Sequence, residues 1–183
     1  MSQLIEKAAL FMENNTSDDN WRLNVMQIPN KNRFKVSEKI RFEIKANNSG
    51  YLYIFAKNAN NKSILVYPNM SEPKNNFFQA EQKIVMPRDG SGWEMEISEP
   101  CGTEKLAIVF SGKPIIDETM LEKFLAKQDN FAFCDVTNKI ESIFQPLANQ
   151  KFAESDNLAG SKIAIVGTKS KWTKFVVEYV VEK

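Results

Sequence analysis

The chain has 183 residues, of which 43% are hydrophobic and 26% are charged, a composition typical of one folded globular domain. Its 24 Lys and Arg residues against 23 Asp and Glu residues leave a net charge of +1, and the lysines are spread along the whole length. A nucleic-acid-binding function is therefore not favoured, because it usually needs a concentrated basic surface.

The first predicted element is a helix over residues 3–13, followed by a polar run over residues 14–20. The helix is indicated by apolar residues at helical spacing, namely Leu4, Ile5, Ala8, Ala9 and Met12. Residues 21–25 then alternate between apolar and polar side chains, which predicts the first strand, and residues 29–32 predict the turn after it.

The clearest pattern in the chain is a set of three alternating runs over residues 40–44, 51–55 and 63–67. Turn-forming residues separate the first two runs at 47–50, and Pro68-Asn69 ends the third. Alternation of period two between turns predicts an antiparallel β-sheet.

The next predicted elements are a loop over residues 70–81 and short strands over 82–86 and 93–97. Residues 106–110 are continuously apolar, which is typical of a strand that is buried on both faces.

Two helices are predicted next, over residues 118–127 and 137–149. Asp117 is the candidate N-cap of the first helix. The second carries Ile140, Ile143, Phe144 and Leu147 on one face, and Pro146 is expected to end or kink it.

The chain is expected to return to the sheet through strands at 163–166 and 172–181. One face of the final strand is apolar and the other is only half polar. If this strand lies at a sheet edge, the pattern predicts a homodimer formed through it.

Together these elements predict a mainly β fold, namely an antiparallel β-sandwich, immunoglobulin-like or related, of about eight or nine strands. No linker divides the chain, so residues 1–183 are expected to form a single domain. Its parts are an N-terminal helix with a polar linker (1–20), the sandwich core (21–112), a helical insertion (113–150, with the two helices near 117–149) and the closing strands (151–183).

Five short motifs follow one another between roughly residues 30 and 112. They are Phe34 with Ser37-Glu38, Ile40-Phe42-Ile44, Gly50-Tyr51-Leu52-Tyr53-Ile54, Val66-Tyr67-Pro68-Asn69 and Pro100-Cys101-Gly102-Thr103-Glu104. In this order they resemble a bacterial family of domains of unknown function, in which a Gly is usual at the position of Ser37. The resemblance implies a β-sandwich accessory module of the kind fused to serine/threonine kinases, caspase-like peptidases or secretion- and envelope-associated proteins. It implies no catalytic residues.

Catalytic and metal-binding chemistry is poorly supported by the residues. The chain contains no histidine, which excludes Ser-His-Asp and Cys-His nucleophile systems and histidine metal sites. Cys101 and Cys134 are expected to be free thiols, with a single bridge as the alternative. Gly167-Thr168-Lys169-Ser170 departs from the phosphate-loop spacing and is interpreted as a turn. We therefore expect no enzyme activity, no metal and no cofactor.

Three glutamates are candidate catalytic groups. Glu94 and Glu96 share one side of a predicted strand, about 6.5 to 7 Å apart, a separation that suits an inverting glycosidase. Because Trp93, Met95 and Ile97 alternate with them, the simpler interpretation is a solvated strand face. Glu104 is expected to accept backbone N–H groups in a turn.

The expected function is a non-catalytic module that binds another protein. Its candidate interaction surface is Tyr67, Asn69, Phe77 and Phe78, although Phe77-Phe78 could instead pin a loop to the core and Asn69 could bond its own turn. A small-molecule or glycan binder is the alternative, using Trp21, Tyr67, Trp93 or Trp172 on a concave face. A carboxylate-based hydrolase is the least favoured hypothesis.

Localisation can be inferred only from the absence of targeting patterns. No apolar run approaches the ~20 residues that span a bilayer, and Met1–Lys7 lacks the pattern of a signal peptide. A cytoplasmic protein is expected, or a secreted or envelope-associated one if the native N-terminus differs.

Overall fold

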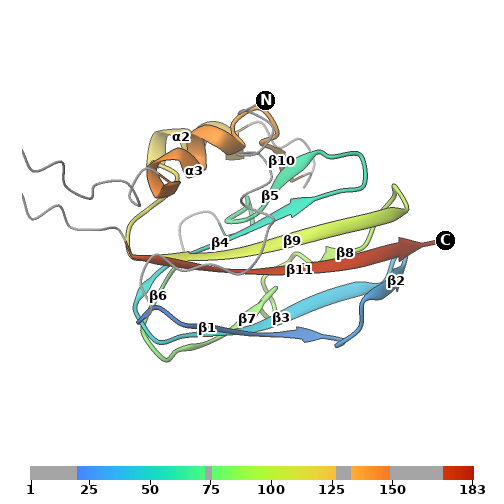
Figure 1. Cartoon of the computed structure of the whole chain (residues 1–183), viewed down its shortest axis with the longest axis horizontal. Helices are drawn as coiled ribbons and strands as arrows, with labels where there is room; N and C mark the ends of the chain where they lie inside the picture. The colour runs from blue at the N-terminus through green and yellow to red at the C-terminus, as the bar shows by residue number, and fades with distance from the viewer. Residues whose placement is uncertain (1–19, 73–75, 127–132, 149–170) are drawn as a thin grey trace, which may run out of the picture.

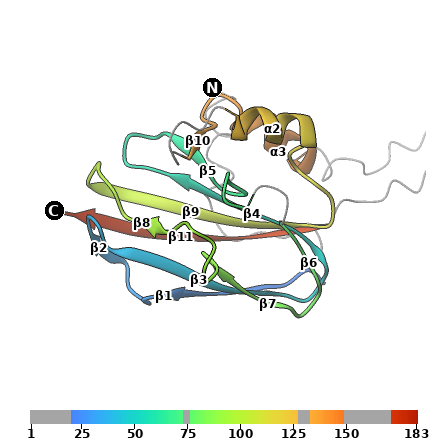
Figure 2. The same ribbon diagram turned by 180° about the vertical axis from the view of Figure 1, so that it is seen from behind.

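The protein is mainly β, with two sheets facing each other as layers and two helices on the outside of one of them (Figures 1 and 2). The computed structural model describes residues 20–72, 76–126, 133–148 and 171–183. The smaller sheet contains β1 (Leu23–Ile28), β3 (Lys39–Ala46), β7 (Lys83–Met86) and β8 (Met95–Glu96). The larger sheet contains, in spatial order, β10 (Cys134–Asp135), β5 (Ser63–Tyr67), β4 (Gly50–Lys57), β9 (Gly102–Ser111), β11 (Trp172–Glu182) and β2 (Arg33–Lys35), with β6 (Phe77–Phe78) beside β4.

The main core lies between the two sheets, because alternate side chains of each strand point inward. In β3 the inward row is Ile40, Phe42 and Ile44, all at most 2% exposed. Rows from β4, β9 and β11 meet it, including Leu52, Ile54, Leu106, Ile108, Phe110, Tyr179 and Val181. Residues that alternate in the sequence therefore point alternately into the core between the sheets and away from it.

A second core lies on the outer face of the larger sheet, under α2 (Glu118–Leu125) and α3 (Ile140–Ala148). Phe55, Val109 and Trp172 project from the sheet toward this side, and Phe124 and Ile143 come from the helices. The sheet is thus covered on both faces, which explains why residues 106–110 are continuously apolar. All five of these residues are buried.

The two helices of the predicted insertion therefore cover the outer face of the larger sheet. The predicted cap of α2 is confirmed, since the backbone N–H of Met120 donates to the Asp117 carboxylate at 2.8 Å. Between the helices, β10 pairs with β5, so the insertion also contains sheet. The α3 helix continues to Ala148, two residues beyond Pro146.

The connection from β3 to β4 passes from one sheet to the other. Asn47 closes it, since its Oδ1 accepts from Arg22 N at 2.8 Å and its Nδ2 donates to Asn20 O at 2.6 Å. Gly50 then begins β4 where the backbone of β9 approaches closely. A Cβ added at Gly50 would lie 2.6 Å from the carbonyl oxygen of Ser111.

A tight turn between β2 and β3 explains the motif of Phe34 with Ser37-Glu38. Phe34 is 1% exposed and packs edge-on against Tyr179. Ser37 has a φ of 71°, a left-handed conformation that favours glycine. The Glu38 carboxylate accepts from Lys35 N and Lys31 Nζ, both at 2.7 Å, which holds its pKa below the usual value.

The strand predictions for residues 40–44, 51–55, 63–67, 82–86, 106–110 and 172–181 are confirmed, although β8 is shorter than the strand predicted over 93–97. The described residues form eleven strands rather than eight or nine, because β2, β6, β8 and β10 are only two or three residues long. The helix predicted at 3–13, the strand at 163–166 and the turn at 167–170 lie outside the described residues.

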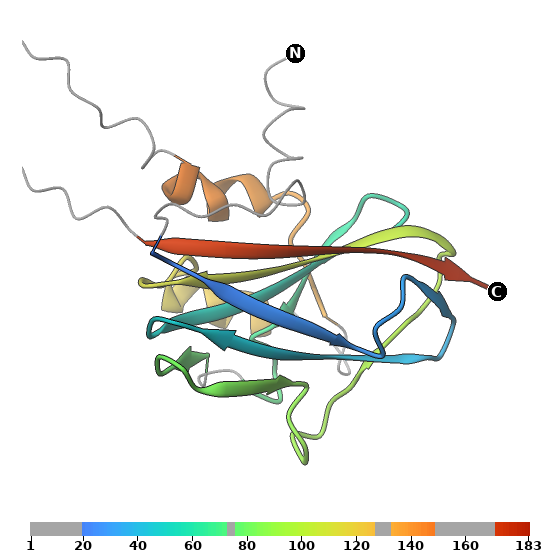
Figure 3. The same cartoon turned by 60° about the horizontal axis from the view of Figure 1, so that its bottom comes forward.

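The final strand β11 pairs with β9 along its length and with β2, in parallel, only at Val180–Glu182 (Figure 3). Within the described ranges no strand pairs with residues 172–179 on the side away from β9. The homodimer through this edge stays a prediction.

No helix in the described part of the chain is both long enough and apolar enough to cross a bilayer.

Candidate binding site around Trp93

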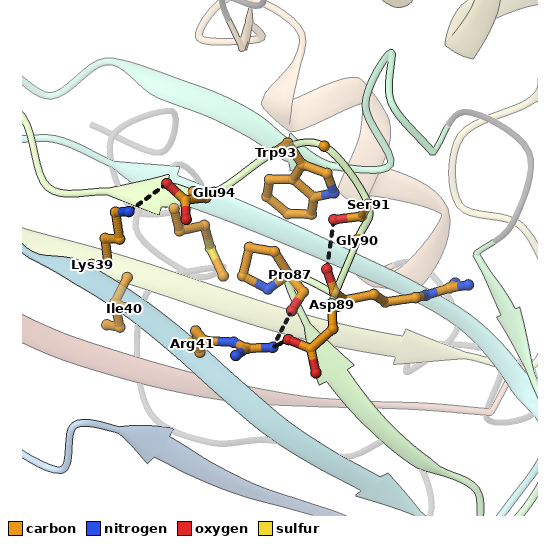
Figure 4. A pocket seen from close by; sticks show the side chains of 12 residues that line it. Lys39, Ile40, Arg41, Pro87, Asp89, Gly90, Ser91, Trp93 and Glu94 are labelled. Carbon is orange, nitrogen blue, oxygen red and sulfur yellow. Dashed lines mark hydrogen bonds and ion pairs between the residues drawn. The ribbon is translucent and has the colours of Figure 1, made fainter.

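A hollow beside the smaller sheet, which we call the Trp93 pocket, has a volume of about 450 Å³ (Figure 4). It is lined by Lys39, Ile40 and Arg41 of β3 and by residues 87–95, the segment that joins β7 to β8. The Trp93 indole, Pro87 and Met95 supply apolar surface, and charged side chains stand around them. The pocket therefore combines an apolar centre with a charged rim.

Two exposed ion pairs form the rim. Lys39 Nζ lies 2.7 Å from the Glu94 carboxylate, and Arg41 Nη2 lies 2.7 Å from Asp89 Oδ1. Arg41 also donates to the backbone oxygen of Pro87 at 3.0 Å. Exposed pairs contribute only about 0 to 1 kcal/mol to stability, so these charges can exchange partners with little loss to the fold.

The segment over residues 87–92 bends sharply around two glycines. Gly90 and Gly92 have φ values of 75° and 78°, which side chains other than glycine adopt only with strain. Ser91 Oγ donates to the backbone oxygen of Arg88 at 2.8 Å and closes the turn between them. The bend places Trp93 against Tyr67, the last residue of β5.

Trp93 is held by three aromatic or polar contacts. Its indole stacks on Tyr67 with 6.2 Å between ring centroids and 11° between planes, and it meets Phe133 edge-on at 6.3 Å. The indole Nε1 donates to Glu72 Oε1 at 2.9 Å. A partly buried tryptophan fixed in this way offers a preformed apolar surface.

Glu72 and Arg88 form a second layer behind the indole. Arg88 Nε lies 3.0 Å from Glu72 Oε2, and the Glu72 side chain is 10% exposed. Arg88 Nη2 donates to the Tyr67 hydroxyl at 3.3 Å, and its guanidinium stands 5.1 Å from the centre of the Phe78 ring. Burial raises the pKa of Tyr67, so its hydroxyl keeps its proton.

Asn69 positions Glu72 by closing the turn after β5. Its Oδ1 accepts from the backbone N–H groups of Ser71 at 3.0 Å and Glu72 at 3.2 Å, and its Nδ2 donates to Val66 O at 3.1 Å. The interpretation that Asn69 bonds its own turn is confirmed.

A second hollow of about 190 Å³ shares Gly92, Trp93 and Glu94 with the Trp93 pocket. Asn69, Met70, Ser71 and Phe133 complete it, and Met70 is 51% exposed. Trp93 thus contributes to both hollows.

The four residues predicted as an interaction surface do not form one continuous exposed patch. Tyr67, Asn69 and Phe78 are buried at 0%, 4% and 4% exposure, while Phe77 is 45% exposed and meets Tyr51 edge-on. Phe78 is thus the aromatic that pins this segment to the core. Tyr67, Asn69 and Phe78 instead support Trp93 and Arg88, and a partner contact at Phe77 stays a prediction.

Sequence reasoning did not single out Glu72 or Arg88, and it considered Trp93 only for the alternative of a glycan binder. The other aromatics of that alternative, Trp21, Tyr67 and Trp172, are at most 8% exposed. A signal was present in the sequence, since a tryptophan follows a charged turn with two glycines at residues 87–92.

The three candidate catalytic glutamates lie in two different strand regions, Glu94 and Glu96 at β8 and Glu104 in β9. Glu94 and Glu96 are exposed while Met95 and Ile97 are buried, as the solvated-face interpretation expects, and Glu94 pairs with Lys39. Glu104 lies within β9 rather than in a turn; it accepts from the backbone of Ala59, as expected, and also from the Tyr179 hydroxyl.

Metal and thiol chemistry find little support among the described residues. These residues contain no group of three or more acidic or sulfur side chains arranged to hold a metal ion. Cys101 and Cys134 are not joined by a disulfide, in agreement with the first of the two interpretations of the pair.

Comparison with known protein families gives a match in the region of the five motifs. No curated protein and no solved structure matches the chain. Residues 33–114 match the family model described as a domain of unknown function, DUF4384. The segment that builds β2 to β9 and the Trp93 pocket is therefore similar to this family, as the motifs had indicated.

Proposed function

We propose that this protein is a non-catalytic accessory module that binds another protein through the Trp93 pocket, on a β-sandwich scaffold of immunoglobulin-like or related type. The proposal rests on one observation. Trp93 is partly buried and fixed by its neighbours, and the charged groups around it form only solvent-exposed ion pairs. Protein interfaces commonly have this anatomy, with a tryptophan or arginine at an apolar centre and a polar rim.

Preorganisation favours binding at this place. A partner side chain that covers the Trp93 ring loses little to reorganisation, because Tyr67, Phe133 and Glu72 already fix the indole. The rim contributes Lys39 and Arg41 against Asp89 and Glu94, so it is close to neutral. We expect a partner with a central apolar side chain and flanking polar groups of both signs.

Selection of peptides from a displayed random library tests the proposal. Peptides that bind the wild-type chain should lose at least tenfold in affinity for Lys39→Glu/Arg41→Glu, because the reversed charges repel Glu94 and Asp89 and alter the rim. The matched control is Lys105→Glu. It reverses one charge of an exposed ion pair, Lys105–Glu178, on the other sheet.

Peptides that bind both variants as well as the wild type would contradict the proposal. Turnover of a substrate by the wild type, abolished by Glu94→Gln or Glu96→Gln, would replace it with the hydrolase hypothesis. Saturable binding of a free sugar at the Trp93 pocket, in place of peptides, would favour the glycan-binding alternative.

A further inference from the structure

A smaller cavity of about 90 Å³ lies between the two sheets, beside β8. Its walls are mostly apolar and include Ile40, Val66, Ile97 and Leu106. Ile40 and Met95 also line the Trp93 pocket, but the two hollows otherwise have different residues. We call this hollow the Glu104 cavity.

The most deeply buried acidic side chain that lines the cavity is Glu104. Glu104 belongs to the inward row of β9 that continues with Leu106 and Ile108, and it is 9% exposed. The Tyr179 hydroxyl donates to Glu104 Oε2 at 3.0 Å, and the Glu104 carboxyl also accepts from the backbone of Ala59. An acidic side chain therefore occupies an inward position of β9, where the neighbouring inward positions are apolar.

This buried carboxyl lacks a counter-charge in the described structure. No Lys or Arg among the described residues forms an ion pair with Glu104, and the adjacent Lys105 pairs with Glu178 instead. Burial raises the pKa of Glu104, because the ionised form is poorly solvated there. Buried acidic groups are normally paired with a positive charge. A cation that enters the cavity would supply this counter-charge to Glu104.

The other ionisable groups that line the cavity would also favour a cation. They are the exposed carboxylates of Glu96 and Glu99 and the phenol of Tyr179, and none of the described residues that line it is basic. Burial and the neighbouring Glu104 raise the pKa of Tyr179, so this phenol stays protonated and keeps its role as a donor. A cation approaching from the side of Glu96 and Glu99 therefore meets negative charge first and the Glu104 carboxylate inside.

We propose that the Glu104 cavity binds a primary alkylammonium group, with the alkyl chain between the apolar walls and the ammonium against the Glu104 carboxylate. An ammonium has three N–H donors, which suit a carboxylate that already accepts from Tyr179. Such a group occurs in small amines and in lysine side chains of proteins. The proposal for the Glu104 cavity does not depend on partner binding at the Trp93 pocket.

Titration of the wild-type chain with n-butylammonium, followed by NMR, tests the proposal directly. At about pH 8 the amine should cause saturable shifts at Ile97, Leu106 and Tyr179, whereas the neutral analogue n-butanol should cause none. Binding should weaken as the pH falls through the raised pKa of Glu104, because protonation removes the negative charge. Absence of saturable shifts, or equal shifts with n-butanol, would overturn the proposal.

Two variants separate the role of Glu104 from a general effect of charge. Glu104→Gln keeps the shape of the side chain and should weaken the amine by at least tenfold, while Glu178→Gln, an exposed glutamate on the same sheet, should leave it unchanged. Equal affinity of wild type and Glu104→Gln would contradict the proposal. If Glu104→Gln does not fold, the wild-type pH dependence decides, since pH-independent binding is incompatible with a role for this carboxylate.

The source of the ammonium is distinguished by comparing n-butylammonium with a short peptide that carries one lysine. Tighter binding of the peptide, lost when its lysine is acetylated, indicates a protein ligand. Equal or weaker binding of the peptide indicates a small amine.

Discussion

The indole of Trp93 and the phenol ring of Tyr67 lie almost parallel, with 6.2 Å between their centroids. Tyr67 ends β5 of the larger sheet and is fully buried, whereas Trp93 precedes β8, which pairs with β3 of the smaller sheet. This contact therefore joins the two layers at the point where the Trp93 pocket opens. Changes at Trp93 should affect both stability and binding, and the two effects can be separated.

Trp93→Phe and Trp93→Ala should differ in their effects on stability. Trp93→Phe keeps an apolar ring against Tyr67 but leaves Glu72 Oε1 without its indole donor, which we expect to cost about 1 to 2 kcal/mol. Trp93→Ala also removes the ring contacts and should cost about 2 to 4 kcal/mol. Urea unfolding of the three proteins measures this, and equal losses would show that the ring stacking contributes nothing.

Asn69→Ala should destabilise the chain by about 1 to 3 kcal/mol, because Ser71 N, Glu72 N and Val66 O all lose their partner in a buried turn. The exposed Asn24 of β1 is the matched control, and Asn24→Ala should stay within about 0.5 kcal/mol of the wild type. Thermal unfolding compares the two, and a neutral Asn69→Ala would show that the turn does not depend on this side chain.

Ser37→Gly should stabilise the chain by up to about 1 kcal/mol. Ser37 has a positive φ, and the strain that its Cβ causes there outweighs the extra unfolded-state entropy of glycine. Ser98→Gly, at an exposed position without a positive φ, should instead destabilise it by about 0.5 to 1 kcal/mol. Chemical denaturation distinguishes these signs, and a loss of stability in Ser37→Gly as large as that in Ser98→Gly would contradict this account.

Glu104→Gln should change how stability depends on pH. The folded-state pKa of Glu104 is raised, so the wild type has its full contribution from this group below the unfolded-state value of about 4.5, and loses it as the pH rises through the folded-state pKa. Because Gln does not ionise, the difference in stability between Glu104→Gln and wild type should increase in favour of the variant over that range. Unfolding measured at a series of pH values checks this, and a pH-independent difference would show that Glu104 does not titrate with a raised pKa.

The strands could be predicted because their inward and outward rows are regular, as in Ile40, Phe42 and Ile44. The assignment of strands to sheets could not be predicted, since alternation carries no information about which neighbour a strand pairs with. Residues 47–49 have the sequence of a turn whether they join two strands of one sheet or pass between sheets. In the structure they connect β3 of the smaller sheet to β4 of the larger one. The parallel pairing of β2 with β11 joins residues that are far apart in sequence.

The candidate site could be predicted only in part, for a related reason. Tyr67, Asn69 and Phe78 were found because they end strands or interrupt a polar loop, and they support the Trp93 pocket from beneath. Their burial, and the contacts of Tyr67 and Phe78 with Arg88, depend on long-range packing. No local pattern distinguishes an aromatic that faces solvent from one that faces the core.

Photo-crosslinking from residue 89 tests the central claim most directly, because Asp89 stands on the rim of the Trp93 pocket with its side chain 92% exposed. A crosslinker placed there in the cells that make this protein should capture a defined partner protein, and Trp93→Ala should abolish the capture. A crosslinker at exposed Glu178, on the other sheet, should not capture this partner. Capture of the same proteins from both positions, or capture from residue 89 that survives Trp93→Ala, would contradict partner binding at the Trp93 pocket.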